Sequence, residues 1–179
     1  MLELALSDVE QAFKQLEFSI KLMLYCELGN LDKEKFDSDV TILLEEENIG
    51  FPAGSFQSDQ EIITASRINV SICFGVSAIV LDAAFETAKI ECNPNSRDQQ
   101  DELRTLVYMV RCAFAHNIAK PCWEARGNFA RNIKLNLGES DLSLDMVALH
   151  GNDFDYPHIG GFANWYKIRE MAVLVIKDT

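Results

Sequence analysis

The sequence lacks the patterns that usually mark disulfide-linked, zinc-binding and nucleic-acid-coating proteins. Its five cysteines are odd in number and include no Cys-x-x-Cys pair, so neither a disulfide framework nor a zinc knuckle is expected. Only 16 Lys and Arg stand against 28 Asp and Glu. The resulting net charge of -12 disfavours sequence-blind binding to nucleic acid or to an anionic membrane. Because no basic, apolar leader precedes the first expected helix, we expect a cytoplasmic protein with reduced thiols.

Proline is also scarce, with four residues in 179, and this leaves long stretches free to form helices. Capping boxes at Ser7, Ser58 and Ser96, each with Glu or Gln three residues later, predict three helix starts. Helical periodicity predicts a further, closing helix over residues 162–176. With 48% apolar residues, we expect one domain over 1–179, folded as an all-α, four-to-five-helix up-and-down bundle.

The longest expected helix runs from residue 58 to about residue 91 without a proline. Between residues 68 and 85 it is apolar nearly all round, but interspersed polar residues favour burial among helices over a membrane span. Small residues and an aspartate share one side, where a neighbouring helix can come close: Ser71, Gly75, Ala78 and Asp82. The turn signal at residues 93–95 then predicts an antiparallel pair with the next helix.

Two segments depart from the helical pattern. Residues 30–56 carry weak signals and are expected to form a loop with one short ordered piece, in which Glu45, Glu46 and Glu47 form a solvated surface run. Over about 131–146, apolar residues alternate with polar ones around a turn at residues 138–140. This alternation predicts a β-hairpin appended to the helical body.

The helix expected over residues 97–116 organises the chain. An apolar stripe recurs along it at three- and four-residue steps and is expected to face the core: Leu103, Leu106, Val107, Val110 and Phe114. Small or half-apolar residues on its other face, Thr105, Tyr108, Cys112 and Ala115, indicate that this face is covered as well. Arg111 and His116 are five residues apart, which separates their directions by about 140° around the helix.

Arg111 and His116 have a structural and a chemical interpretation. In the structural one, Arg111 pairs with Glu86 or Asp82, and His116 ends the helix, where the dipole favours a cation. In the chemical one, arginine holds a phosphate and histidine moves a proton. The pair then suffices for transphosphorylation of RNA without a metal, and DNA is spared because it lacks the 2′-hydroxyl.

A basic segment surrounds this pair in the otherwise acidic sequence. Between residues 104 and 134 the one acidic residue is Glu124, and the basic residues are Arg104, Arg111, Lys120, Arg126, Arg131 and Lys134. Such a segment suits a phosphate chain, although solvated surface charge is the alternative for each residue. Cys112, His116 and Cys122 could share a metal, but no fourth ligand follows at a usual spacing, so no metal site is expected.

The spacing Arg111-x-x-x-x-His116 near a helix end, with Ala115 before the histidine and Asn117 after it, resembles the HEPN superfamily. Further landmarks resemble its plasmid-borne, toxin-like branch: Pro121, Trp123, the hairpin, Asp145 and Gly160-Gly161. The resemblance implies a homodimer through the face of helix 97–116, in which both arginines and both histidines form one RNA-cleaving cleft.

For function, the resemblance implies a metal-independent endoribonuclease without a cofactor, acting as a toxin or defence effector, with an antitoxin or another protein as partner. Arg111 would bind and polarise the phosphate, His116 would act as base or acid, and Asn117 would orient either. Cations that would line the path of the strand are Arg104, Lys120, Arg126 and Arg131. Neither DNA nor a membrane is an expected partner.

One position departs from the family's pattern. Nuclease members usually carry a polar residue, most often Asn or Asp, directly after the arginine, and this chain has Cys112. Many members of the superfamily do not cleave RNA and act as binding or dimerisation modules. The alternative function is therefore that of a catalytically inactive HEPN dimerisation or binding module.

Overall fold

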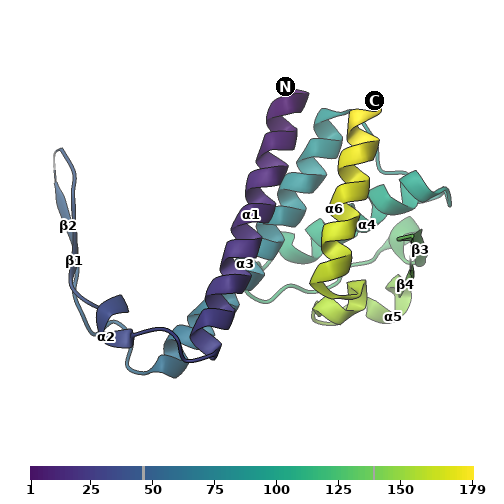
Figure 1. Cartoon of the computed structure of the whole chain (residues 1–179). Helices are drawn as coiled ribbons and strands as arrows, with labels where there is room; N and C mark the ends of the chain where they lie inside the picture. Colours follow the sequence, from purple (N-terminus) through teal and green to yellow (C-terminus); the bar gives the residue numbers. More distant parts are fainter. Residues whose placement is uncertain (46, 139) are drawn as a thin grey trace. The chain divides into compact units, whose positions relative to one another are not determined.

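The computed structural model describes residues 1–45, 47–138 and 140–179 (Figure 1). These residues form a mainly helical protein, as the sequence predicts for its fold class, but with six α-helices where four to five were expected and two small antiparallel hairpins where one was expected. The α-helices are α1 (Leu2–Glu27), α2 (Lys33–Phe36), α3 (Asp59–Thr87), α4 (Gln99–Ala115), α5 (Met146–Leu149) and α6 (Gly161–Lys177). The strands are β1 (Val40–Leu43), β2 (Asn48–Phe51), β3 (Asn132–Asn136) and β4 (Asp141–Asp145), and short 3-10 helices cover Gly127–Phe129 and Tyr156–Ile159.

The chain, for which the sequence predicts a single domain, groups into two compact units. Unit 1 comprises Met1–Lys14 and Ser71–Thr179, and unit 2 comprises Gln15–Val70. Each of the two long helices α1 and α3 contributes one part to each unit. The predicted catalytic pair and all of the candidate RNA-binding residues belong to unit 1.

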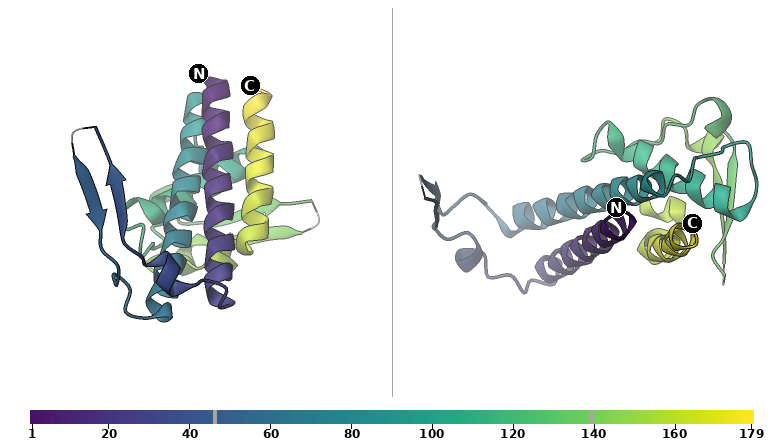
Figure 2. Two further views of the ribbon diagram at one scale, coloured as in Figure 1. Left: turned by 60° about the vertical axis from the view of Figure 1, so that its left-hand side comes forward. Right: turned by 90° about the horizontal axis from the view of Figure 1, so that it is seen from above.

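Within unit 1, α1, α3 and α6 run side by side (Figures 1 and 2). Phe74 of α3 lies at the centre of the core and is fully buried. Aromatic rings from four other segments lie within 6.1 Å of its ring centroid: Phe114, Phe154, Tyr156, Phe162 and Trp165. The indole of Trp165 also donates a 2.9 Å hydrogen bond to the Ser77 hydroxyl, so the polar atom of this buried ring is satisfied. This cluster fixes α3, α4 and α6 around one core.

Helices α3 and α4 are antiparallel, as predicted. The Ser71 hydroxyl near the middle of α3 donates to the carbonyl of Ile118, just beyond the end of α4, whereas Asp82 further along α3 binds Arg104 near the start of α4. Gly75 lies between these points, against the ring of Phe114. The small-residue side of α3 therefore faces α4, as the sequence indicates.

Gly75→Ala is expected to destabilise unit 1. An added Cβ would lie 2.6 Å from Cδ1 of Phe114 and 2.9 Å from Cγ1 of Ile118, and the Phe114 ring is held by the aromatic core. Overpacking of this kind costs about 1–3 kcal/mol, and the higher helix propensity of alanine offsets up to about 1 kcal/mol. We expect the thermal unfolding midpoint to fall by roughly 2–8 °C. Gly50→Ala is the control, since its Cβ meets nothing within 4 Å, and equal midpoints for the two variants would contradict the prediction.

The hairpin predicted at about 131–146 is confirmed as β3 and β4. Its strands pair in antiparallel register, with alternate residues buried along both. The side chain of Gln99 in α4 accepts from the Asn136 amide at 2.7 Å and donates to the Lys134 carbonyl at 3.4 Å. The hairpin is thus attached to the first turn of α4. The predicted turn at residues 138–140 includes Glu139, which lies outside the described residues.

The expectation of a loop over residues 30–56 is wrong, because this segment contains α2 and the hairpin of β1 and β2. The sequence between its two strands has none of the Asn-Gly or Asp-Gly pairs that usually signal a tight hairpin. The sequence signal for a turn was therefore absent. The predicted surface run includes Glu46, which lies outside the described residues, while its neighbours Glu45 and Glu47 are exposed.

Of the three predicted helix starts, one is confirmed. The Ser58 hydroxyl accepts from the Glu61 amide at 3.3 Å, and α3 begins one residue later. The Ser7 start is wrong, because α1 already begins at Leu2.

The Ser96 start is also wrong. Asp98 caps α4 by accepting from the Asp101 amide at 3.0 Å, and the Ser96 hydroxyl donates to the Asp98 carboxylate. The hydrogen bonds from the Ser96 hydroxyl and the Asp101 backbone amide lower the pKa of Asp98 to about 2, since both stabilise the ionised carboxylate.

Helix α3 is the one described helix that is long and apolar enough to cross a membrane by length and composition alone. The mean hydropathy of its most apolar 18-residue window is 1.9, and 56% of that window is buried inside the protein. Packing around Phe74 accounts for this apolar character in unit 1.

Candidate active site at the end of helix α4

The C-terminal end of α4 emerges from the core of unit 1. The predicted apolar stripe is confirmed, since all of its members are buried: Leu103, Leu106, Val107, Val110 and Phe114. The helix then ends at His116, its C-cap residue. Cys122 donates from its backbone amide to the carbonyl of Ala113 at 3.1 Å, which brings the loop after α4 back alongside its last turn. His116 is thus placed next to this returning loop.

Arg111 is half-buried, with 41% of its side chain exposed. Its Nε atom lies 3.7 Å from Oδ2 of Asp82, one of the two carboxylates that the structural interpretation proposed. This distance is longer than a hydrogen bond. The other oxygen of Asp82 accepts a hydrogen bond from Arg104, so Asp82 is shared between two cations. Arg111 therefore keeps an exposed part of its guanidinium side chain and is not sealed inside the subunit.

His116 is exposed, with 77% of its side chain accessible. Its Nε2 atom lies 3.9 Å from Oε2 of Glu124, and the same oxygen lies 3.7 Å from Nη2 of Arg126. The sequence analysis did not assign Glu124 to the site. The signal that could have found it is Pro121, which ends the helical segment and allows the chain to return along α4.

The other two histidines have structural roles. Nδ1 of His150 accepts from the Ala125 amide at 3.1 Å, and Nδ1 of His158 accepts from the Trp123 indole at 3.0 Å. Each ring is thereby fixed by a bond that holds a loop in place. Of the three histidines in the chain, His116 is therefore the one placed for exchange of a proton with a bound ligand.

The second face of α4 is covered in large part by the chain itself. Thr105 is fully buried, and its hydroxyl lies 3.7 Å from the Cys92 thiol. The ring of Tyr108 stacks on Phe129 with centroids 5.0 Å apart. Of the four residues that the sequence places on this face, Ala115 in the last turn is the exposed one. The prediction that this face is covered is thus confirmed for Thr105, whereas Ala115 at the C-terminal end of α4 is exposed.

Cys112, the residue that departs from the HEPN pattern, is half-buried and forms a hydrogen bond with Tyr108. This bond and the charge of the ionised thiol raise the pKa of Tyr108, and partial burial adds to the rise. Cys112 therefore contacts, within α4, the ring that stacks on Phe129.

The candidate RNA-binding cations fall into two groups, and two of them lie in the interior. Arg104 has 4% of its side chain exposed and binds Asp82 and the carbonyl of Ile90. Arg131 has 9% exposed, and its Nη1 donates to both carboxylate oxygens of Glu102 at 2.8 Å. In place of the expected contact with a strand of RNA, these two cations neutralise buried carboxylates. The sequence could not separate them, because their partners are 22 and 29 residues away.

The remaining candidates are exposed near the end of α4. Lys120 lies 3.7 Å from Asp153, and Arg126 shares Glu124 with His116. Asn117 uses its side-chain oxygen to accept from the amides of Ala119 and Lys120 at 3.1 and 3.0 Å. That turn fixes the loop directly after His116 and occupies the Asn117 side chain structurally.

Across residues 1–45, 47–138 and 140–179, no group of three or more His, Cys, Asp and Glu side chains is arranged to hold a metal ion. At the end of α4 the arrangement instead offers a cation for a phosphate, an exposed imidazole and a carboxylate, Glu124, that can orient it. No protein-family model matches this chain, and neither a curated protein nor a solved structure does.

Proposed function

We propose that the chain is a metal-independent endoribonuclease of HEPN type, with Arg111 and His116 at its active site. The observation that carries the proposal is that both side chains are accessible near the end of a helix of which ten residues are buried. An exposed imidazole and a partly exposed guanidinium, five residues apart on the same helix, can supply proton transfer and phosphate binding. The resemblance in spacing and the geometry at the helix end support the same two residues.

The proposed reaction is attack of a ribose 2′-oxygen on the adjacent phosphorus. A new bond forms between phosphorus and the 2′-oxygen as the bond to the 5′-oxygen breaks, which leaves a 2′,3′-cyclic phosphate and a free 5′-hydroxyl. His116 takes the 2′-hydroxyl proton or gives a proton to the leaving 5′-oxygen. Arg111 stabilises the charge that develops on the phosphate oxygens.

One histidine cannot be base and acid at the same instant, so the proposal includes a second copy of the chain. In a two-fold arrangement of the α4 ends, one His116 serves as base and the other as acid. The exposed last turn, which includes Ala115, leaves room for that contact. A toxin or defence effector acting on cellular RNA is the biological role that fits such an activity.

The test is cleavage of a mixed-sequence RNA by the purified full-length chain in the presence of EDTA. We expect cleavage with EDTA present, products that mass spectrometry identifies as 2′,3′-cyclic phosphates, and no cleavage of DNA of the same sequence. An RNA with a 2′-deoxy substitution at a mapped cleavage position is expected to resist cutting there.

Cleavage at the 2′-deoxy position, or its complete loss in EDTA, would overturn this mechanism. Absence of cleavage of any RNA would favour the second candidate function, a binding or dimerisation module without catalysis. That candidate rests on Cys112, which contacts Tyr108 at the position where nucleases of this type carry a polar residue.

A further inference from the structure

The hairpin of unit 2 has one face that is wholly apolar. In the register of β1 and β2, Val40 lies opposite Phe51, and Ile42 lies opposite Ile49. Because opposite residues in a strand pair point the same way and side chains alternate along each strand, these four share one face. We call Val40, Ile42, Ile49 and Phe51 the hairpin face. Their exposed fractions are 38–52%, so each of them presents apolar surface to solvent within unit 2.

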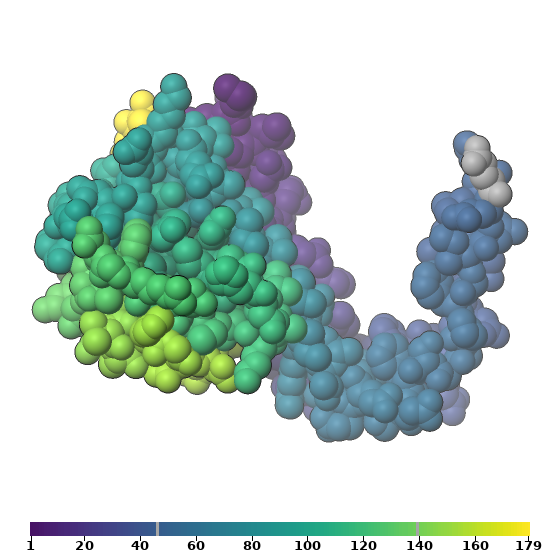
Figure 3. Space-filling model, turned by 180° about the vertical axis from the view of Figure 1, so that it is seen from behind, coloured from purple at the N-terminus to yellow at the C-terminus, as the bar shows by residue number. Residues whose placement is uncertain are grey.

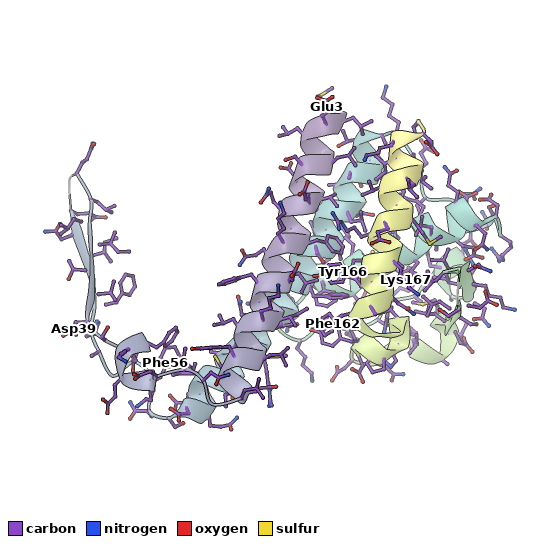
Figure 4. All side chains as sticks on the ribbon, viewed as in Figure 1. Glu3, Asp39, Phe56, Phe162, Tyr166 and Lys167 are labelled. Carbon is purple, nitrogen blue, oxygen red and sulfur yellow. The ribbon has the colours of Figure 1, made fainter. Side chains whose placement is uncertain are left out.

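The base of this hairpin is held by a set of hydrogen bonds. Asp39 accepts from the Ala53 amide at 2.7 Å, and the Asp37 carboxylate accepts from the amides of Ser55 and Phe56 at 3.1 and 2.9 Å. Figure 4 shows Asp39 and Phe56 at this base. The two carboxylates therefore fix the direction in which the strands leave α2, which makes the hairpin a defined element.

A hairpin of two strands is at best marginally stable in water, and it becomes stable when a helix or further strands cover its apolar face. In Figure 3 no other segment of unit 2 covers the visible side of this hairpin. Burial of apolar area contributes about 25 cal/mol per Å², so covering four large side chains provides a substantial driving force for association. The hairpin face is therefore suited to a partner.

Charge selects the kind of partner. Unit 2 contains 4 Lys and Arg against 11 Asp and Glu, a net charge of -7, and Glu45 and Glu47 flank the turn of the hairpin. This charge repels nucleic acid and an anionic membrane. It also opposes pairing of the hairpin with that of a second copy, because two units of the same sign would meet. A cationic protein surface is attracted.

We propose that the hairpin face binds a basic amphipathic helix of another protein. The apolar stripe of that helix covers the hairpin face, as a helix covers a sheet in layered folds, and its Lys and Arg residues meet the carboxylates at the turn. The site lies in unit 2, whereas Arg111 and His116 lie in unit 1. The inference is thus independent of the proposed nuclease function.

The probe is a labelled synthetic helix with leucine on one face and lysine on the other, and its binding to the full-length chain is followed by fluorescence anisotropy. We expect the lysine peptide to bind and a matched peptide with glutamate in place of lysine not to bind. Ile42→Thr and Ile49→Thr are expected to weaken binding at least tenfold, since threonine keeps the strand preference but removes apolar area. Higher salt should weaken binding without abolishing it.

Leu43→Thr is the matched control, because Leu43 lies on the opposite face of the same hairpin and is 75% exposed. It should leave binding unchanged. Equal binding of the two peptides would overturn the choice of a cationic partner, and equal effects of Ile42→Thr and Leu43→Thr would overturn the hairpin face. A dimer in sedimentation that Ile42→Thr converts to a monomer would show instead that a second copy occupies this face.

Discussion

RNA cleavage by the His116→Ala protein is expected to be about 10²–10⁴-fold slower than cleavage by the unaltered chain, because the variant loses the group that moves the proton. His116 is exposed at the C-cap of α4, and its Nε2 lies 3.9 Å from Oε2 of Glu124, which is longer than a hydrogen bond. The fold should therefore tolerate its removal. The measurement is the initial rate of cleavage of labelled RNA in EDTA, together with the thermal unfolding midpoint of each protein.

Arg111→Ala is expected to lower the same rate by about 10²–10³-fold, the usual effect of removing one group that stabilises developing charge. Arg111→Lys should recover part of the loss, since lysine keeps the charge but not the planar fork that binds two phosphate oxygens. A merely structural role for Arg111 would instead give parallel losses of cleavage and stability in both variants.

His150→Asn is the control for these measurements. His150 is exposed, and its Nδ1 accepts a hydrogen bond from one backbone amide. The side-chain oxygen of asparagine can accept this hydrogen bond in place of Nδ1. The control should cleave RNA at the unaltered rate. Full cleavage by His116→Ala would refute the role of His116, and a loss that is equal in His116→Ala and His150→Asn would point to misfolding.

The sequence predicts the helical scaffold well because local patterns encode it. The stripe from Leu103 to Phe114 repeats with the helical period, and every member is buried. The close approach of α4 to Gly75 follows from residue size within a single helix. The hairpin of β3 and β4 alternates with period two and is bounded by a glycine turn, so it too could be predicted.

The parts that the sequence does not predict depend on partners that are distant in the chain. Arg104 and Arg131 look like members of a basic surface until the fold supplies Asp82 and Glu102 as their buried partners. Glu124 joins His116 only because the loop after α4 turns back. Ser96 and Asp98 are both residue types that can cap α4. The structure uses Asp98, because its carboxylate accepts from the Asp101 amide and the Ser96 hydroxyl donates to that carboxylate instead.

Asp82→Asn is expected to lower the free energy of unfolding by about 3–5 kcal/mol, because it leaves the buried Arg104 charge without an anion. Both side chains of this pair are 4% exposed, so water cannot replace the lost carboxylate. For a chain of this length the thermal midpoint should fall by roughly 6–20 °C. Glu10→Gln, which breaks an exposed ion pair with Lys14, should leave the midpoint nearly unchanged.

The double variant Asp82→Leu/Arg104→Met tests whether the buried ion pair stabilises the fold or only offsets the cost of burying its two charges. Replacing both buried charges with apolar side chains removes the cost of desolvating them, so this variant should be more stable than Asp82→Asn. It also removes the Asp82 carboxylate, which lies 3.7 Å from Arg111. Arg111 then has no nearby Asp82 charge to compete with a bound phosphate. RNA cleavage that persists in the double variant would separate the chemistry at the end of α4 from the ion pair that supports it. A double variant no more stable than Asp82→Asn would mean that Arg104 contributes chiefly through its bond to Ile90 and its contact with the ring of Phe85.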